Sequence, residues 1–192
     1  ERTGYIIAAC DEIIQGKLDC WFITDVIQGG AGTSTNMNAN EVVANRAAQL
    51  AGKALGVYDY IHPNDHVNFG QSTNDVFPTA GKLTALFLVE DLLEELMLLQ
   101  EALLDKSIEF NDVIKLGRTH LQDAVPIRMG QEFHAFATAI VRDIRRIKVA
   151  FSNLKSVNMG ATAVGTGINT DERYKRICVK HLCDITQIEL TS

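Results

Sequence analysis

The sequence lacks the features that would tie it to nucleic acid or to a membrane. Lys and Arg number 18 against 24 Asp and Glu, so the net charge is −6 and a broad cationic surface is not expected. No apolar run is long enough to span a bilayer, and the N-terminal residues do not form a signal peptide. We therefore expect a cytoplasmic protein whose partners include neither nucleic acid nor a membrane.

Motifs for the common cofactors and metals are also missing. The four cysteines are Cys10, Cys20, Cys178 and Cys183. They form no C-x-x-C pair and no zinc-type spacing with histidine, so we interpret them as reduced thiols. The glycine-rich stretch 29–32 is followed by neither G-K-[ST] nor a strand–helix–strand unit, which argues against a nucleotide-phosphate loop. His62 and His66 are four residues apart, but Pro63 lies between them and no Glu or Cys completes a ligand set. We expect no metal and no cofactor.

What the sequence does contain is helical periodicity. Apolar residues recur at spacings of three and four, which is typical of amphipathic helices, over about 5–18, 33–52, 79–110, 129–157 and 171–183. The third helix would be about 45 Å long, and its wide apolar band needs more than one neighbour, as in a helix bundle. A brief extended segment is considered at 21–27, but no convincing sheet is expected. The sequence predicts a mainly α protein with an N-terminal helical domain at 1–71 and a long-helix bundle domain at 72–192.

Three polar segments that carry hydroxyl groups precede predicted helices, at 29–41, 71–79 and 115–126. Thr33 to Thr35 and Ser72 to Asp75 are capping residue types, and Pro78 suits a first helical turn. A helix start with spare hydroxyls and free N–H groups can bind a carboxylate or a phosphate. One such segment is usually only a cap. Three of them in one chain favour a small anion with more than one acidic group.

Asparagine is concentrated in the helix predicted at 33–52, at Asn36, Asn38, Asn40 and Asn45. Asparagine is a poor helix former because its amide competes with the backbone for hydrogen bonds. Four in ten residues therefore indicate a buried amide network that positions other groups. The alternative is a surface helix of mediocre propensity.

The chemistry that these residues favour involves an oxyanion that gains charge during reaction. Neutral hydroxyl and amide donors suit such an anion, which favours proton abstraction next to a carboxylate through an aci-carboxylate intermediate. His120 is the histidine that lies within one of the three segments, and its ordinary pKa near 6.5 allows proton exchange at neutral pH. No Ser/His/Asp order or catalytic Cys/His pair stands out, so the residues alone leave the base unassigned.

Six segments, taken in order, resemble the aspartase/fumarase superfamily. They are G-G-A-G-T-S at 29–34, N-M-N-A-N-E-V at 36–42, H-P-N-D-H-V-N at 62–68, Q-S-T-N-D at 71–75, G-R-T-H-L-Q-D-A at 117–124 and G-T-G-I-N-T at 165–170. The G-G-A-G-T-S form, rather than G-S-G-T-Q-S, and the M-G-A-T-A run at 159–163 are most similar to the aspartase branch, aspartate ammonia-lyase.

The resemblance implies a homotetramer built on a long-helix bundle, with three subunits contributing to each active site. The implied reaction is the reversible elimination of ammonia from L-aspartate to give fumarate. The implied substrate-binding residues are Thr33, Ser72, Thr73, Asn74, Thr119 and His120. Of these, Thr119 and His120 would be catalytic and would reach in from another subunit. A second, non-catalytic dicarboxylate site would comprise His62, Asn64 and Asp65.

One signature of the family has no counterpart in the sequence. The G-S-S-x-M-P-x-K-x-N loop, which carries the serine base, is not found, nor is the acidic partner of the active-site histidine. The chain begins at Glu1 without Met and ends at Ser192, so we expect a fragment without the C-terminal part that is inactive by itself. The alternatives are fumarate hydratase and a non-catalytic helical scaffold. The argininosuccinate and adenylosuccinate lyases fit less well.

Overall fold

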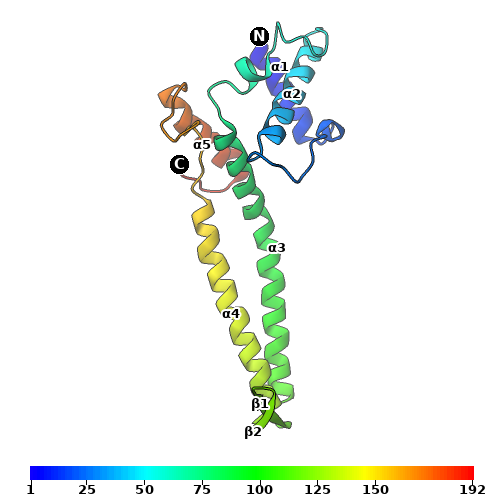
Figure 1. Cartoon of the computed structure of the whole chain (residues 1–192), viewed down its shortest axis with the longest axis vertical. Helices are drawn as coiled ribbons and strands as arrows, with labels where there is room; N and C mark the ends of the chain where they lie inside the picture. Colours follow the sequence, from blue (N-terminus) through cyan, green and yellow to red (C-terminus); the bar gives the residue numbers. More distant parts are fainter. The chain divides into compact units, whose positions relative to one another are not determined.

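The computed structural model describes residues 1–192 and is mainly helical, which confirms the predicted fold class. The α-helices are α1 (Arg2–Ile14), α2 (Thr33–Leu50), α3 (Thr73–Glu109), α4 (Met129–Leu154) and α5 (Glu172–Thr186) (Figure 1). The shorter elements are a 3-10 helix η1 (Asp19–Trp21), a π-helical turn η2 (Pro63–Val67) and the strands β1 (Ile114–Thr119) and β2 (Gln122–Arg128). None of the helices combines the length and the apolar character needed to cross a membrane.

The chain divides into two compact units. The first comprises residues 1–82 and 156–192, and the second comprises residues 83–155. The boundary between them falls within α3, so one long helix contributes to both. The domain division at 71/72 that the sequence suggests stays a prediction.

The core of the first unit forms where α1 packs against α2. Its fully buried residues are Ala9, Ala44, Ala47 and Ile61, with Val43 nearly so. Small alanine side chains allow the two helices to approach closely. Beside this core, the Arg46 guanidinium donates to both carboxylate oxygens of Glu12, with the Nη2–Oε1 pair at 2.8 Å. This bond lowers the pKa of Glu12 and ties α2 to α1.

The N-terminus of α2 is set by a glycine rather than by hydroxyl caps. Gly32 is the N-cap with φ of +86°, and no side chain caps the helix, so the predicted capping by Thr33, Ser34 and Thr35 is wrong. A Cβ atom at position 32 would lie 2.5 Å from the ring of Phe77. Only glycine satisfies both requirements. As a result, the start of α2 packs directly against the first turns of α3.

The start of α3 follows the predicted capping pattern. The N–H of Asn74 donates to Ser72 Oγ at 3.2 Å, and the N–H of Ser72 donates to Asp75 Oδ2 at 2.9 Å. These reciprocal bonds begin the helix at Thr73, so Pro78 lies inside it. The prediction that Pro78 occupies the first turn is therefore wrong, and the Asn74 carbonyl cannot receive the usual helical bond.

The second unit contains a β-hairpin that the sequence pattern does not predict. Strands β1 and β2 pair antiparallel, with Ile114 opposite Arg128 and Thr119 opposite Gln122. His120 and Leu121 make the two-residue turn with φ of +52° and +60°. Two positive φ values are the requirement of a type I′ hairpin turn, which usually selects Asn-Gly. The expectation of no convincing sheet is therefore corrected, although this sheet has only two strands.

The hairpin connects α3 to α4 within the second unit. The N–H of Met129 donates to the Val113 carbonyl at 2.8 Å, and the N–H of Gly130 donates to the Phe110 carbonyl at 3.0 Å. Figure 1 shows α4 running back from the hairpin in the direction opposite to α3. Phe110, directly after α3, packs against Phe133 of α4 with ring centroids 5.5 Å apart.

Candidate functional site

The first turn of α3 presents hydrogen-bond donors whose protons have no acceptor within the chain. Ser72 Oγ and Thr73 Oγ1 each accept a hydrogen bond, from the Asn74 N–H and from Asn36 Nδ2 at 3.0 Å. A hydroxyl group has a single proton, and neither hydroxyl proton is bonded within the chain. The N–H of Thr73 likewise has no acceptor. The helix start therefore offers three neutral donors to a ligand, at the positive end of the helix dipole.

A buried carboxylate holds this helix start in place. The Asp75 side chain is fully buried. Its Oδ2 accepts the Ser72 N–H at 2.9 Å, and its Oδ1 accepts the Thr162 N–H at 2.7 Å. Asn74 adds a second connection, because its Nδ2 donates to the Ala163 carbonyl at 2.9 Å. The loop between α4 and α5 is thus fixed to α3 by charge-assisted and amide hydrogen bonds.

Thr162 has an unusual conformation at this connection. It adopts φ of +58°, which is uncommon for a β-branched residue. Its side chain is only 6% exposed, and its Oγ1 is the buried polar side-chain atom that lacks a hydrogen-bond partner. Such strain and such unpaired groups cluster at functional sites.

These groups surround a cavity of about 370 Å³. The lining residues are Asn68, Gly70, Gln71, Ser72, Thr73, Thr162, Ala163, Ile168 and Asn169. None of them carries a charged side chain. The cavity therefore suits a small polar ligand bound through hydroxyl, amide and backbone donors rather than through fixed lysines.

The four predicted asparagines form separate hydrogen-bond groups, in one of which Asn45 donates to Tyr58 Oη and accepts the Gly56 N–H. Asn36 and Asn40 are buried, at 6% and 8% exposure, and connect α2 with Thr73 and with Asn68. Asn38 instead binds the stretch before α2, where its Oδ1 accepts the Ile23 N–H at 2.9 Å. That stretch forms bends and no strand, so the extended segment considered at 21–27 is not present. The buried-network prediction is confirmed for Asn36 and Asn40.

The predicted substrate-binding residues fall into separate places. Ser72 and Thr73 line the cavity, whereas Asn74 and Thr33 do not. Thr33 is exposed, and its hydroxyl donates to the Gly30 carbonyl at 3.1 Å. It follows Gly32 directly and so lies at the α2 end that packs against α3.

Thr119 and His120 belong to the second unit, at the turn between β1 and β2. Both are exposed. The positive φ of His120 belongs to the turn itself. The imidazole ring of His120 is therefore exposed at the turn end of the hairpin.

The residues of the predicted second dicarboxylate site share one turn. His62 caps η2, and its Nδ1 accepts the N–H groups of Asn64 and Asp65 at 3.2 Å each. The N–H of His62 in turn donates to His66 Nδ1 at 2.8 Å. Here the imidazole of His62 occupies the backbone donors that an anion would use, so a ligand would have to displace it.

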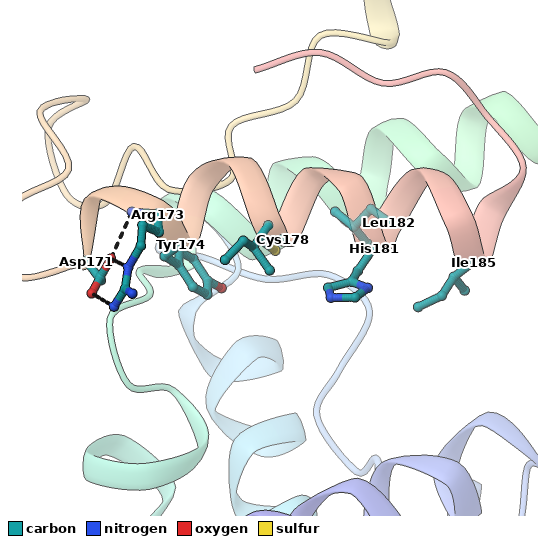
Figure 2. A pocket seen from close by; sticks show the side chains of 8 residues that line it. Asp171, Arg173, Tyr174, Cys178, His181, Leu182 and Ile185 are labelled. Atoms are coloured by element: carbon teal, nitrogen blue, oxygen red, sulfur yellow. Dashed lines mark hydrogen bonds and ion pairs between the residues drawn. The ribbon is translucent and has the colours of Figure 1, made fainter.

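A wider groove lies along α5, where Tyr174, Cys178, His181 and Ile185 project from one face (Figure 2). Burial raises the pKa of both Tyr174 and Cys178. Both groups therefore stay protonated at neutral pH, and the groove supplies no ionised nucleophile. All four cysteines of the chain are unpaired, as predicted.

The chain is similar to named lyases over its whole length. It is 55% identical to an aspartate ammonia-lyase from Bacillus sp over 192 residues, which cover 100% of this chain and 41% of that protein. Its structure is similar to that of a fumarate lyase:delta crystallin from Brucella melitensis bound to cobalt, with a TM-score of 0.88 and 49% identity over 100% of this chain and 42% of that one. A class II fumarase from Schistosoma mansoni gives a TM-score of 0.84 and 39% identity over 97% of this chain and 39% of that one.

The chain therefore spans about two fifths of the length of the relatives that it matches. The aspartase/fumarase resemblance predicted from the six sequence segments is confirmed. The family sequence model that matches is described as lyase, and it covers residues 1–192. Because this match extends over every residue, the chain belongs to the lyase family.

Proposed function

We propose that the protein eliminates ammonia reversibly from L-aspartate to give fumarate, as an aspartate ammonia-lyase. The observation that carries the proposal is the cavity at the start of α3, where Ser72 and Thr73 offer neutral donors to an anion. The 55% identity to a protein named aspartate ammonia-lyase supports the choice of substrate.

The proposed mechanism begins with removal of the proton from the carbon next to one substrate carboxylate. That carboxylate then carries additional negative charge as an aci-carboxylate, and hydrogen-bond donors held in place stabilise it more than the ground state. Ser72, Thr73 and Asn74 would bind a carboxylate and the region of the leaving amine, together with Thr33. Thr119 and His120, from a neighbouring subunit, would complete the site, and His120 would exchange protons.

The serine base that the family resemblance implies is not among residues 1–192. We propose that the 192-residue chain by itself does not catalyse the reaction, although it carries the donors that bind the substrate. The activity test therefore uses the polypeptide encoded by the complete open reading frame. No metal or other cofactor enters the proposed mechanism.

A homotetramer is part of the proposal. Within the second unit, the apolar face of α3 stays exposed at Phe87, Leu88 and Leu92, at 55%, 63% and 48%. Contiguous apolar surface of this kind is typical of an interface, and long helices that bury such faces form bundles. We place the assembled enzyme in the cytoplasm and propose His62, Asn64 and Asp65 as a second, non-catalytic dicarboxylate site.

The test is fumarate formation from L-aspartate, followed by the ultraviolet absorbance of fumarate. The proposal expects formation from L-aspartate and its loss in the Ser72→Ala variant. Formation from L-malate instead would favour fumarate hydratase, which the similarity to a class II fumarase supports as the second candidate. A protein that acts on neither compound would be a non-catalytic helical scaffold.

A further inference from the structure

We infer that Asn36 is a positioning residue that fixes the Thr73 hydroxyl as a hydrogen-bond donor toward the ligand carboxylate. The inference rests on the proposed function for the identity of the ligand. Its structural basis is the direction of a chain of hydrogen bonds that runs from Asn40 through Asn36 to Thr73.

The orientation of the Asn40 amide sets this direction. Asn40 Nδ2 lies 2.8 Å from the Asn36 carbonyl oxygen, 3.3 Å from Asn36 Oδ1 and 3.3 Å from Asn68 Oδ1. The Asn36 carbonyl is a backbone oxygen, which only accepts hydrogen bonds. An amide oxygen at the Nδ2 position would face this acceptor at 2.8 Å without a proton between them. The donor must therefore be the Asn40 nitrogen.

The orientation of Asn36 follows from that of Asn40. Because Asn36 Oδ1 accepts from Asn40, the other end of the amide is the NH₂ group, and it lies 3.0 Å from Thr73 Oγ1. The Thr73 oxygen accepts this bond with one lone pair, and its single proton stays available. Since Thr73 lines the cavity, that proton is available to a ligand oxygen there.

Burial makes it costly to reverse the donor-to-acceptor direction of these hydrogen bonds. Asn36 and Asn40 are 6% and 8% exposed, so water does not compete for their amides. Hydrogen bonds in such surroundings are strong, and an unmatched buried polar group carries a large penalty. Asn36 also belongs to α2, whose start is held against α3 by the contact between Gly32 and Phe77. The donor therefore has a fixed position as well as a fixed direction.

The test is Asn36→Asp, which replaces the NH₂ donor by an accepting oxygen and leaves the shape of the side chain almost unchanged. The introduced carboxylate can only accept, so it takes the Thr73 proton away from the ligand and adds a negative charge nearby. The probe is succinate, an unreactive dicarboxylate, and its affinity for the polypeptide of the complete reading frame is measured by calorimetry. We expect the dissociation constant to rise by about 10- to 100-fold, the effect of losing one hydrogen bond to a charged group.

The pH profile separates positioning from a purely structural role. Burial raises the pKa of a carboxyl group, so lowering the pH from about 8 to about 6 protonates the introduced group and lets it donate to Thr73 again. The affinity ratio of Asn36→Asp to the unmodified protein should then recover. Asn38→Asp is the matched control, because it makes the same change on the same helix but binds the stretch before α2.

The results distinguish a failure of the positioning role of Asn36 from a failure of the proposed function. If Thr73→Val weakens succinate binding and Asn36→Asp does not, the positioning role of Asn36 is overturned and the dicarboxylate site stands. Equal losses in Asn36→Asp and Asn38→Asp, without recovery at lower pH, also overturn it. If the unmodified protein does not bind succinate, or Thr73→Val binds it as well as the unmodified protein does, the assignment of this cavity to a dicarboxylate fails and the inference fails with it.

A second variant covers the case in which Asn36→Asp does not fold. Asn36→Ala removes the donor to Thr73 without adding charge. If Asn36 acts through Thr73, Asn36→Ala weakens succinate binding in the unmodified background and has no further effect in Thr73→Val. Additive losses in the double variant would contradict the inference.

Discussion

Replacing Asp75 by asparagine should destabilise the candidate site. The Asp75 carboxylate is fully buried and accepts the N–H groups of Ser72 and Thr162 at 2.9 and 2.7 Å. An asparagine side chain keeps one accepting oxygen and turns an NH₂ group toward the other backbone N–H. One charge-assisted bond is lost, and the backbone N–H and the new NH₂ group that faces it are both left without an acceptor. We expect a decrease of about 2–4 kcal/mol in the free energy of unfolding.

The assay is urea denaturation followed by circular dichroism, with Asp91→Asn as the control. Asp91 is an exposed residue of the same helix α3, so the control should change the free energy by less than about 0.5 kcal/mol. Hydrogen exchange locates the effect, because the amides of Ser72 and Thr162 should lose protection before those of the α1–α2 core. Equal stability of the Asp75→Asn and Asp91→Asn variants, with both amides still protected, would refute this reasoning.

Three further predictions follow from other contacts. Thr162→Val replaces an unpaired buried hydroxyl by a methyl group of the same shape, so the free energy of unfolding should stay the same or rise by up to about 1 kcal/mol; a loss above about 1 kcal/mol in urea would show that the hydroxyl is bonded. Gly32→Ala should cost at least about 2 kcal/mol, visible as a lower melting temperature, because φ is +86° and the new Cβ would lie 2.5 Å from Phe77. The hydrogen bond from the Arg173 side chain lowers the pKa of Asp171 from 3.8 to about 2, so its stabilisation of α5 is present above pH 3.8 and disappears as the pH falls toward 2. The difference in melting temperature between the unmodified protein and Asp171→Asn should shrink over that interval, and a constant difference would contradict the assignment.

Helices were the part of the fold that the sequence predicted well. The periodic apolar residues of α3 and α4 and the capping residues at Ser72 are local signals, and local signals determine most of a long helix. The preference of proline for a first turn predicts a helix that starts near Pro78. The bond between the Ser72 N–H and Asp75 instead starts α3 at Thr73.

The hairpin and the cavity depend on contacts that no local pattern encodes. His120 and Leu121 adopt positive φ without the Asn or Gly that is typical of such a turn, so the residue types predict a polar segment before a helix rather than two strands. Thr162 joins Asp75 from 87 positions away along the chain. The small residues of its segment predict only a loop, and neither composition nor spacing indicates that this loop contributes to the cavity.

A capping pattern and a family resemblance both predict Ser72 and Thr73 as substrate-binding residues, and both residues line the cavity. Whether Thr33, Asn74, Thr119 and His120 bind the same ligand stays a prediction. The sequence predicts the role of Asn36 only in part. Its unusual residue type indicated a buried network, but the direction of the hydrogen bonds required the positions of Asn40 and Thr73.

The most direct test of the central claim is the affinity of succinate for the polypeptide of the complete reading frame, measured with and without the Ser72→Ala change. Loss of the Ser72 hydroxyl removes one donor from the cavity and the acceptor of the Asn74 N–H, while the bond from the Ser72 N–H to Asp75 remains. The account predicts saturable binding that becomes about 10-fold weaker or worse in the variant. Binding of equal strength in both proteins would place the dicarboxylate elsewhere and contradict the account.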